Sequence, residues 1–552
     1  MLTHFHIQNF KAWKDTGPIR LAPLTVIFGA NSAGKSSLGH LLLALKQTVL
    51  SADRKRPLHL GDDNALIDLG TFAECIHNHE LSEPLRFELG WQLPGKIEVR
   101  DPVSQARFQG DELRLEVEML ADKQEQPRMQ LMNYILRQDG RVSLEVDYRR
   151  DEKNKLEIHS EQYKFVRNTG RAWPLDEPDK FYRLSDQSRA RFQNAEFLSD
   201  LALETEAALG HIYYLGPLRE YPKRMYSWSG ETPESVGQKG EFTIPAILAA
   251  SAQERLLNRG PRRRQYHFDQ FIAQWLKDLG IIEGFEVKPV ASGRKEYEVL
   301  LKTHNSASVV KLTDVGFGVS QVLPALVQAF YCEPHATVWM EQPEIHLHPQ
   351  VQAELADVFI SATKARENGK ERHIQLIVES HSEHFLNRLQ RRIDVSPECV
   401  TTCVQRLLAM KNNGVVVIDD NYKILREYQN KTHPNEPKGT GDVFLKWLLQ
   451  NTAKVDRVEQ VSVTETANDT YAEFPDPILQ SEFDAPDRKF AAVANAHPDK
   501  PPVWQAADCK WLDWWQTLKI QGITVEFLCP EDACRFYLNK FPGKPVPALP
   551  DN

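Results

Sequence analysis

The stretch IFGANSAGKSSLGHLLLALKQ, residues 27–47, fits the spacing G-x-x-x-x-G-K-[ST] without a mismatch. Glycines let backbone N–H groups curl around phosphates, a lysine supplies positive charge to the β- and γ-phosphates, and a serine hydroxyl can ligate Mg²⁺. We therefore expect this loop to bind ATP and Mg²⁺. The expected nucleotide-binding residues are Gly29, Asn31, Gly34, Lys35, Ser36 and Ser37, with Ser36 also as a magnesium ligand.

The residues on both sides of the loop support this interpretation. LTVIF, residues 24–28, is a β-branched and aromatic run that predicts a strand entering the loop. SSLGHLLLALKQ, residues 36–47, has helical spacing, so the N-terminus of a helix would face the bound anion. The alternative is a glycine-rich turn that matches the pattern by chance, but such a turn requires neither the strand nor the helix.

Length and composition limit the number of domains and the possible partners of the chain. Its 552 residues exceed the size of a single core, so we expect two or three domains. The net charge of −9 gives no overall attraction to nucleic acid, and any such site must be a local patch. The mixed polar start, MLTHFHIQNFK, and the absence of a long apolar run predict a cytoplasmic protein without a membrane partner.

The seven cysteines are scattered and odd in number, which predicts reduced thiols. Cys399 and Cys403 form one close pair in the sequence, and Cys529 and Cys534 form another. These spacings are not those of a known zinc finger, so buried thiols are favoured over a zinc site that would also use His497 and Cys509.

The pattern of the chain changes at two places. From about residue 85 to residue 165, alternating strands such as ELRLEVEML predict an antiparallel sheet, and residues 185–210 read as helical. After Ile393 the character changes again. We therefore expect one domain at 1–393, with an insertion at 85–300, and a second domain at 394–552.

Two further strands predict the second half of the nucleotide site. ATVWM, residues 336–340, leads into Glu341, and IQLIV, residues 374–378, leads into ESHSEH, which contains Glu379 and His381. Such apolar runs are typical of a buried parallel sheet, whose strands end at one edge. Between them, TDVGFGVSQVLPAL, residues 313–326, is a glycine-bearing turn that runs into a helix.

This order of parts resembles the ABC-type AAA ATPases related to SMC, RecF and OLD proteins, and especially a subgroup found in bacterial anti-phage systems. IQNFKAWKD near the start and YYLGPLRE in mid-chain add to the match. The resemblance covers about 1–393 and implies an α/β ATPase head that dimerises around ATP. Carried over, it makes Glu341 the Walker B acid and a magnesium ligand with Ser36, His381 the switch histidine and His348 a D-loop residue. The implied signature consists of Gly316, Gly318, Ser320 and Gln321.

One position departs from that family. The residue after the Walker B acid is normally the catalytic glutamate, but here it is Gln342. A carboxamide cannot accept a proton, although it can orient water, and phosphoryl transfer depends mostly on positioning and charge. The expected catalytic residues are therefore Glu341, Gln342, Glu344 and His381, with Glu379 as another substitute carboxylate; Glu344 could instead form a loop salt bridge.

The second domain carries its own acids. Glu427 lies on an expected helix, Asp484 and Asp487 precede another, and Asp508 follows an expected strand. Asp442, at the start of another expected helix, Asp487 and Asp508 could each be a helix N-cap. If they converge instead, they form a site for Mg²⁺ or Mn²⁺.

FDAPDRKFAAVA and GITVEFLCPE also resemble small PIN-like nucleases, which are metal-dependent RNases. That resemblance implies an α/β domain with metal ligands among Glu427, Asp484, Asp487 and Asp508. The PIN fold opens with a strand ending in a metal-anchoring aspartate, and no such strand is evident here, since Asp394 lies at a junction. We therefore expect weak nuclease activity, with Asp419, Asp420 or Asp442 as the acids that could replace the missing one.

Together these features predict an ATPase that acts as sensor or gate in an anti-phage or toxin-like system, fused to a PIN-like nuclease effector. Expected partners are a second copy of the chain or a higher oligomer, a nucleic acid (DNA or RNA) and a second defence protein. The alternative is a RecF-type DNA-repair ATPase with a non-catalytic C-terminal interaction domain. A third interpretation, motivated by Gln342, is a scaffold that binds ATP without turnover.

Overall fold

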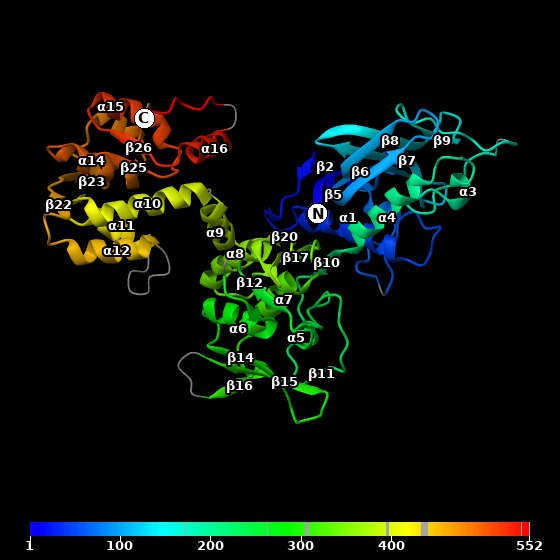
Figure 1. Ribbon diagram of the computed structural model, residues 1–552, viewed down its shortest axis with the longest axis horizontal. Helices are drawn as coiled ribbons and strands as arrows, with labels where there is room; N and C mark the ends of the chain where they lie inside the picture. Colours follow the sequence, from blue (N-terminus) through cyan, green and yellow to red (C-terminus); the bar gives the residue numbers. More distant parts are fainter. Residues whose placement is uncertain are drawn as a thin grey trace. The chain divides into compact units, whose positions relative to one another are not determined.

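The computed structural model describes residues 1–63, 65–171, 173–261, 263–303, 308–393, 397–431, 440–541 and 544–550. The junction residue Asp394 lies outside these ranges. The chain divides into two compact units, Met1–Leu389 and Gln390–Asn552 (Figure 1). No helix among the described residues is long and apolar enough to cross a membrane.

A four-stranded parallel sheet forms the centre of the first unit. Its order is β10-β17-β20-β4, and every neighbouring pair is parallel. Three of its strands were expected and are confirmed, with the bounds β4 Leu24–Phe28, β17 Thr337–Glu341 and β20 Gln375–Ser380; the fourth is β10 Ile212–Leu215. All residues of β17 and β20 are buried, as continuous apolar runs require when both faces of a sheet are covered.

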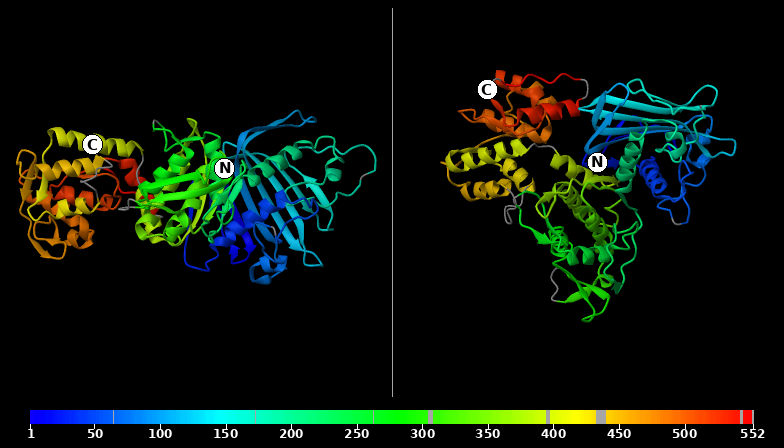
Figure 2. Two further views of the ribbon diagram at one scale, coloured as in Figure 1. Left: turned by 90° about the horizontal axis from the view of Figure 1, so that it is seen from below. Right: turned by 45° about the vertical axis from the view of Figure 1, so that its right-hand side comes forward.

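A second, larger sheet is antiparallel and confirms the alternating pattern of residues 85–165. Its order is β2-β1-β5-β6-β7-β8-β9, with β3 paired to β1. Its long strands are prominent in Figure 2. The bounds are β1 Leu2–Phe10, β2 Trp13–Asp15, β3 Ile19–Arg20, β5 Leu85–Arg100, β6 Arg107–Ala121, β7 Pro127–Gln138, β8 Arg141–Arg150 and β9 Leu156–His159.

Two hydrophobic cores lie on opposite faces of the parallel sheet. Trp339 and Ile377 belong to a core shared with helix α1 (Lys35–Leu50), helix α4 (Phe197–Gly210) and the large sheet. Their strand neighbours Met340 and Val378 belong to the other core, because successive side chains of a strand point to opposite faces. Helix α1 approaches the sheet so closely that a Cβ on Gly39 would lie 2.3 Å from the Trp339 ring.

The remaining elements of the first unit surround these layers. The helical prediction for 185–210 holds for two separate helices, α3 and α4, and the predicted hairpin at 295–312 is confirmed as β15 and β16. The other bounds are α2 Phe72–Cys75, η1 His77–His79, α3 Asp186–Arg189, β11 Tyr226–Ser227, α5 Thr243–Ala252, β12 Leu256–Asn258, β13 Tyr266–His267, α6 Phe268–Asp278, β14 Gly284–Pro289, β15 Glu296–Lys302, β16 Val309–Lys311, η2 Leu312–Asp314, α7 Phe317–Tyr331, α8 Pro349–Lys364, β18 Arg366–Glu367, β19 Lys370–Glu371 and α9 Glu383–Ile393.

The second unit contains three strand pairs among its described residues and a core of its own. Two of the pairs, β21–β22 and β25–β26, are parallel. The bounds are α10 Pro397–Asn413, β21 Val416–Asp419, α11 Lys423–Lys431, α12 Thr440–Asn451, β22 Val458–Val461, β23 Glu465–Ala467, β24 Thr470–Tyr471, α13 Pro477–Glu482, η3 Ala485–Asp487, α14 Arg488–Ala496, β25 Val503–Gln505, α15 Trp511–Ile520, β26 Val525–Phe527 and α16 Pro530–Lys540.

Strand β21 corrects one expectation from the sequence. We predicted that no strand ending in an aspartate opens this domain, but β21 ends at Asp419. The strand is only four residues long and follows helix α10 closely, so its apolar run is too short to stand out. Asp419 is 3 % exposed, and its carboxylate accepts hydrogen bonds from the Lys423 and Ile424 amides.

Candidate nucleotide-binding site

The loop between β4 and α1, called the P-loop below, has the backbone shape that its glycines permit. Gly34 has a φ of 83°, and a Cβ there would lie 2.8 Å from the Cβ of Ala12. The Trp13 indole donates a 2.8 Å hydrogen bond to the Gly34 carbonyl. Gly34 is therefore required for both its conformation and its close neighbours, and the N-terminal segment helps to hold the loop.

Lys35 is buried, and its ammonium group lies where the loop meets β20. Its Nζ donates to the carbonyls of Gly29 at 3.0 Å and Ala30 at 2.7 Å. The same atom is 3.5 Å from Nδ1 of His381 and 4.0 Å from Oε1 of Glu379. The structure thus brings the predicted phosphate-binding lysine and the predicted switch histidine together across 346 residues of sequence.

Ser36 contacts the carboxylate of Glu379, which the sequence had suggested only as a substitute for the missing catalytic glutamate. Its hydroxyl donates a 3.1 Å hydrogen bond to Oε1 of Glu379. We had paired Ser36 with Glu341 as the magnesium ligands, but β20 lies between β17 and β4, so Glu379 is the acid beside the loop. The other oxygen, Oε2 of Glu379, is buried and has no hydrogen-bond partner among the described residues.

This donor set fits Mg²⁺. The ion prefers oxygen ligands and is commonly held by one or two carboxylates together with substrate phosphates. Ser36 and Glu379 supply a hydroxyl and a buried carboxylate oxygen that needs a partner. Glu341 lies directly opposite Glu379 in the pairing of β17 and β20, so it belongs to the same edge of the sheet.

Three residues that the sequence analysis did not single out surround Glu341. The Tyr214 hydroxyl donates a 3.1 Å hydrogen bond to Oε1, and His40 Nε2 lies 3.9 Å from the same atom. Arg219 donates to the Glu341 carbonyl at 3.4 Å. Tyr214 and Arg219 both lie in the YYLGPLRE motif, which had served only for the resemblance; for His40 the sequence carries no comparable signal.

Burial controls the charge of this cluster. It raises the pKa of Glu341 to about 7, and the neighbouring charge of Glu379 adds to the effect. It also lowers the pKa of His40 to about 4, so the His40 imidazole is neutral at pH 7 and forms no ion pair with Glu341. Without nucleotide, the site therefore holds an acid that is half protonated near neutral pH.

Arg219 is a half-buried cation with incomplete hydrogen bonding. Its Nε and Nη1 atoms are buried and lack partners among the described residues. Burial lowers the pKa of Arg219 to about 10, which still leaves the guanidinium charged at pH 7. Unsatisfied N–H groups of a charged side chain are costly, so Arg219 is suited to bind an anion at this edge of the sheet.

The loop after β17 positions the segment that contains His381. Glu344 is buried, and its Oε1 accepts 2.8 Å hydrogen bonds from the Ser380 hydroxyl and the His381 amide. Among the described residues these two hydrogen bonds, and not the loop salt bridge that we considered, engage the Glu344 carboxylate. It supports the backbone of His381 instead.

Gln342 follows β17 directly and has an uncommon backbone conformation. Its φ is 45°, in the left-handed region that few residues other than glycine adopt. Its amide donates a 2.8 Å hydrogen bond to the Glu379 carbonyl. This main-chain hydrogen bond joins the ends of β17 and β20 and holds the Gln342 backbone beside Glu379.

The predicted signature lies at the start of α7. Gly316 is its N-cap residue with a φ of −58°, and a Cβ there would meet nothing within 4 Å. Ser320 is buried in the first turns, and a Cβ on Gly318 would lie 3.9 Å from Leu347. His348 is exposed and caps α8, accepting a 3.3 Å hydrogen bond from the Gln350 amide.

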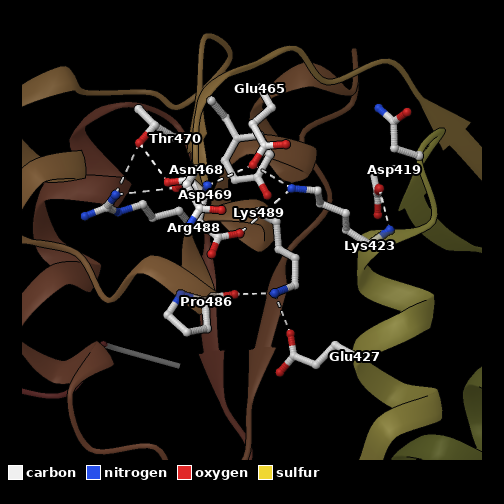
Figure 3. Close-up of polar contacts among 12 residues, drawn as sticks. Asp419, Lys423, Glu427, Glu465, Asn468, Asp469, Thr470, Pro486, Arg488 and Lys489 are labelled. Carbon is white, nitrogen blue, oxygen red and sulfur yellow. Dashed lines mark hydrogen bonds and ion pairs between the residues drawn. The ribbon is translucent and has the colours of Figure 1, made fainter.

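Two of the four candidate acids of the second unit pair with lysines. Glu427 forms a 2.5 Å ion pair with Lys489, which also donates to the Pro486 carbonyl (Figure 3). Asp484 pairs with Lys510. Asp487 caps no amide with its side chain and instead accepts a 3.2 Å hydrogen bond from Trp511.

These acids form no compact metal site in the described part of the chain. The group of His, Cys, Asp and Glu residues whose ligand atoms lie within 4.8 Å of one another there consists of Cys399, Cys403 and Cys529. The sequence left open whether Glu427, Asp487 and Asp508 converge, and these three acids are not part of that group. Their charges do interact, because burial raises the pKa of Asp487 and the charges of Asp508 and Glu427 add to this effect.

One protein-family model matches a segment of the first unit. Residues 254–386 match the family model described as AAA ATPase domain. The matched segment contains α7, β17 and β20, and the parallel sheet joins it to the P-loop. Comparison with curated proteins found no match.

Solved structures of SMC heads are similar to this chain at low identity. The SMC head domain from Thermotoga maritima has 11 % identity and a TM-score of 0.31, and the match covers 70 % of this chain and 91 % of that one. An Smc head with an extended coiled coil, bound to the C-terminal domain of ScpA derived from Pyrococcus furiosus, has 10 % identity and a TM-score of 0.28, with the same coverage.

Proposed function

We propose that this chain binds and hydrolyses ATP with Mg²⁺ at the carboxyl edge of its parallel sheet. The observation that carries the proposal is the convergence of Lys35 and Ser36 with Glu379 and His381, from two distant segments, around one loop. A P-loop without acidic and polar partners could bind phosphate, but hydrolysis also requires groups that position water and stabilise charge.

The residues have distinct roles in this proposal. Lys35 exchanges its bonds to the Gly29 and Ala30 carbonyls for the β- and γ-phosphates of ATP. Ser36 and Glu379 would hold Mg²⁺, with Glu341 as the second acid. When bound, the ion neutralises charge on the phosphates.

The remaining groups act on the γ-phosphate and the attacking water. Arg219 directs unsatisfied N–H groups toward the charge that develops during transfer. His381, held by Glu344, donates to the γ-phosphate. Gln342 orients water, which a carboxamide can do without accepting a proton. Slow turnover is the expected result.

Steady-state ATP hydrolysis by the full chain tests this proposal. We expect Mg²⁺-dependent phosphate release that is lost in Ser36→Ala and Glu379→Gln. Glu333→Gln, a substitution of an exposed acid, serves as the control. Tight ATP binding without phosphate release would favour the scaffold interpretation instead.

We further propose that ATP joins two copies of the chain. The first turn of a helix has backbone N–H groups without partners inside the helix, and the small residues Gly316 and Gly318 leave room for a phosphate to approach the first turn of α7. In this arrangement the α7 N-terminus of one copy completes the P-loop site of the other.

For the second unit we propose a PIN-like, metal-dependent nuclease gated by the ATPase. Strand β21, which ends in Asp419, and the mutual influence of Asp487, Asp508 and Glu427 support it. Lys489 must leave Glu427 before that acid can bind a metal. Mn²⁺-dependent cleavage of RNA or DNA by the full chain, lost in Asp487→Asn but kept in the exposed-site control Asp499→Asn, is the test.

The anti-phage role and the second defence protein rest on the family resemblance. Plaque counts on bacteria that express the wild-type chain, Lys35→Ala or Asp487→Asn test the role. Protection that requires both residues supports it, and equal plaque counts on all strains contradict it. Copurification from infected cells tests the protein partner.

The lysine pairs favour the alternative of a non-catalytic interaction domain on a RecF-type repair ATPase. Lys489 and Lys510 already neutralise two of the four candidate acids. Absence of cleavage under all metal conditions, together with DNA-stimulated ATP hydrolysis, would support this second function.

A further inference from the structure

Three cysteines from distant parts of the sequence meet in the second unit. Cys399 and Cys403 lie one turn apart on α10, and Cys529 is the N-cap residue of α16. Their sulfur atoms all lie within 4.8 Å of one another, and the sulfurs of Cys403 and Cys529 are 3.8 Å apart. The prediction of reduced thiols is wrong for Cys399 and Cys529, which the structure joins, whereas Cys403 is a free, half-buried thiol.

A disulfide explains only part of this arrangement. The structure joins Cys399 to Cys529, across a sequence separation of 130 residues. A disulfide uses two sulfurs and leaves the third, on Cys403, without a role. By contrast, zinc–thiolate bonds of about 2.3 Å in a tetrahedral site place ligand sulfurs about 3.8 Å apart, which matches the distance from Cys403 to Cys529.

Helix α10 has little apolar packing against the rest of the second unit. None of its described residues belongs to the hydrophobic core of the second unit, and Val400 and Leu408 are exposed. Cys399, in contrast, is buried. The sulfur cluster therefore joins a helix with little apolar packing to the joint between β26 and α16, which lies near the other end of the unit's sequence.

We propose that Cys399, Cys403 and Cys529 bind one zinc ion as thiolates and fasten α10 to the β26–α16 joint. A thiol or phosphine reductant supplies the two electrons and two protons that convert the Cys399–Cys529 bond to thiols. Each thiol then releases its proton to solvent as its sulfur binds, and water completes the fourth position. A cavity of about 630 Å³ is lined by sequence neighbours of the cysteines, Thr402 and Arg406 of α10 and Leu528 and Pro530 beside Cys529.

Metal content and cobalt spectra of the full chain test this inference. The chain is purified with a non-chelating reductant, supplied with zinc and dialysed before elemental analysis. We expect one zinc ion per chain. Replacing zinc with Co²⁺ should produce a thiolate-to-cobalt charge-transfer band and the visible bands of tetrahedral cobalt.

Matched cysteine variants separate the zinc site from its alternatives. Cys403→Ser should lower zinc affinity at least tenfold and lower the melting temperature, whereas Cys534→Ser, on α16 but outside the group, should match the wild type. Zinc content at background in the wild type, or equal content in Cys403→Ser and Cys534→Ser, would overturn the proposal. A Cys399–Cys529 disulfide in the zinc-supplied reduced protein, detected by intact mass, would overturn it as well.

Discussion

The Ser36 hydroxyl donates a 3.1 Å hydrogen bond to the Glu379 carboxylate, although 343 residues separate the two in sequence. The contact arises because β20 pairs directly with β4, the strand that leads into the P-loop. It makes Glu379 the acid beside the P-loop, one strand nearer than Glu341.

Glu379→Gln should therefore weaken Mg²⁺-dependent ATP binding. The substitution keeps the shape of the side chain but removes the charge that a hard cation requires. We expect a loss of roughly 10- to 100-fold in apparent Mg²⁺ affinity, by analogy with the usual effect of altered metal surroundings. Titration of Mg²⁺ at fixed ATP measures it, and an unchanged midpoint would contradict the role of Glu379.

Lys35→Ala should remove ATP binding, because the loop loses the cation that faces the phosphates. Equilibrium binding of a fluorescent ATP analogue measures the effect, with the exposed Lys14→Ala as control. His381→Ala should instead keep binding within a few-fold and slow hydrolysis. If Lys35→Ala binds ATP like the wild type, the P-loop assignment is wrong.

Arg219→Gln should slow hydrolysis more than it weakens binding. Its buried, unsatisfied N–H groups suit the charge of the transition state, and loss of such a donor costs roughly 10²- to 10³-fold in rate. Single-turnover measurements at saturating ATP separate this effect from binding. Equal losses in binding and rate would indicate a structural role for Arg219 instead.

Glu341→Gln should change the pH dependence of stability. Burial raises the pKa of Glu341 to about 7 from 4.5. The stability that this carboxyl group contributes to the folded chain is therefore fully present below about pH 4.5 and is lost as pH rises through 7. Without nucleotide, the variant should therefore gain stability relative to wild type between about pH 5 and 8, by about 1–3 kcal/mol. Denaturant unfolding across this range measures it, and a difference that stays constant with pH would refute the raised pKa.

Gly316→Asp should prevent ATP-dependent dimerisation without unfolding the chain. The position has open space and a φ that any residue adopts, and aspartate is a favourable N-cap, but its charge repels the γ-phosphate. Gly316→Asn, the neutral control, should still dimerise by light scattering with ATP and Mg²⁺. A monomeric wild-type protein under these conditions would contradict the dimer.

Mixing two inactive variants gives a sharper test of the same dimer. Lys35→Ala and Gly316→Asp alter different halves of the composite site. A mixed dimer contains one site with an intact P-loop and an intact α7 N-terminus, so the mixture should recover part of the ATPase activity. If mixed dimers are detected but the ATPase activity does not recover, Lys35 and Gly316 belong to one site within a single chain.

The sequence by itself determined the local parts of the nucleotide site. The P-loop spacing, the apolar runs of β17 and β20 and the alternation of the large sheet are local patterns that periodicity and residue type reveal. They predicted where strands end in acids and where a helix N-terminus faces an anion. Strand β21 was not predicted, because four residues beside a long helix carry too little periodicity to indicate a strand.

Only the tertiary structure decided which of these parts touch. Strand order places Glu379 beside Ser36 and Glu341 beside Tyr214, and no local pattern encodes that order. The same holds for Cys529, which meets Cys399 and Cys403 only through packing of the second unit. Contacts between distant segments depend on the burial of whole faces, which is a property of the assembled core rather than of any single stretch of sequence.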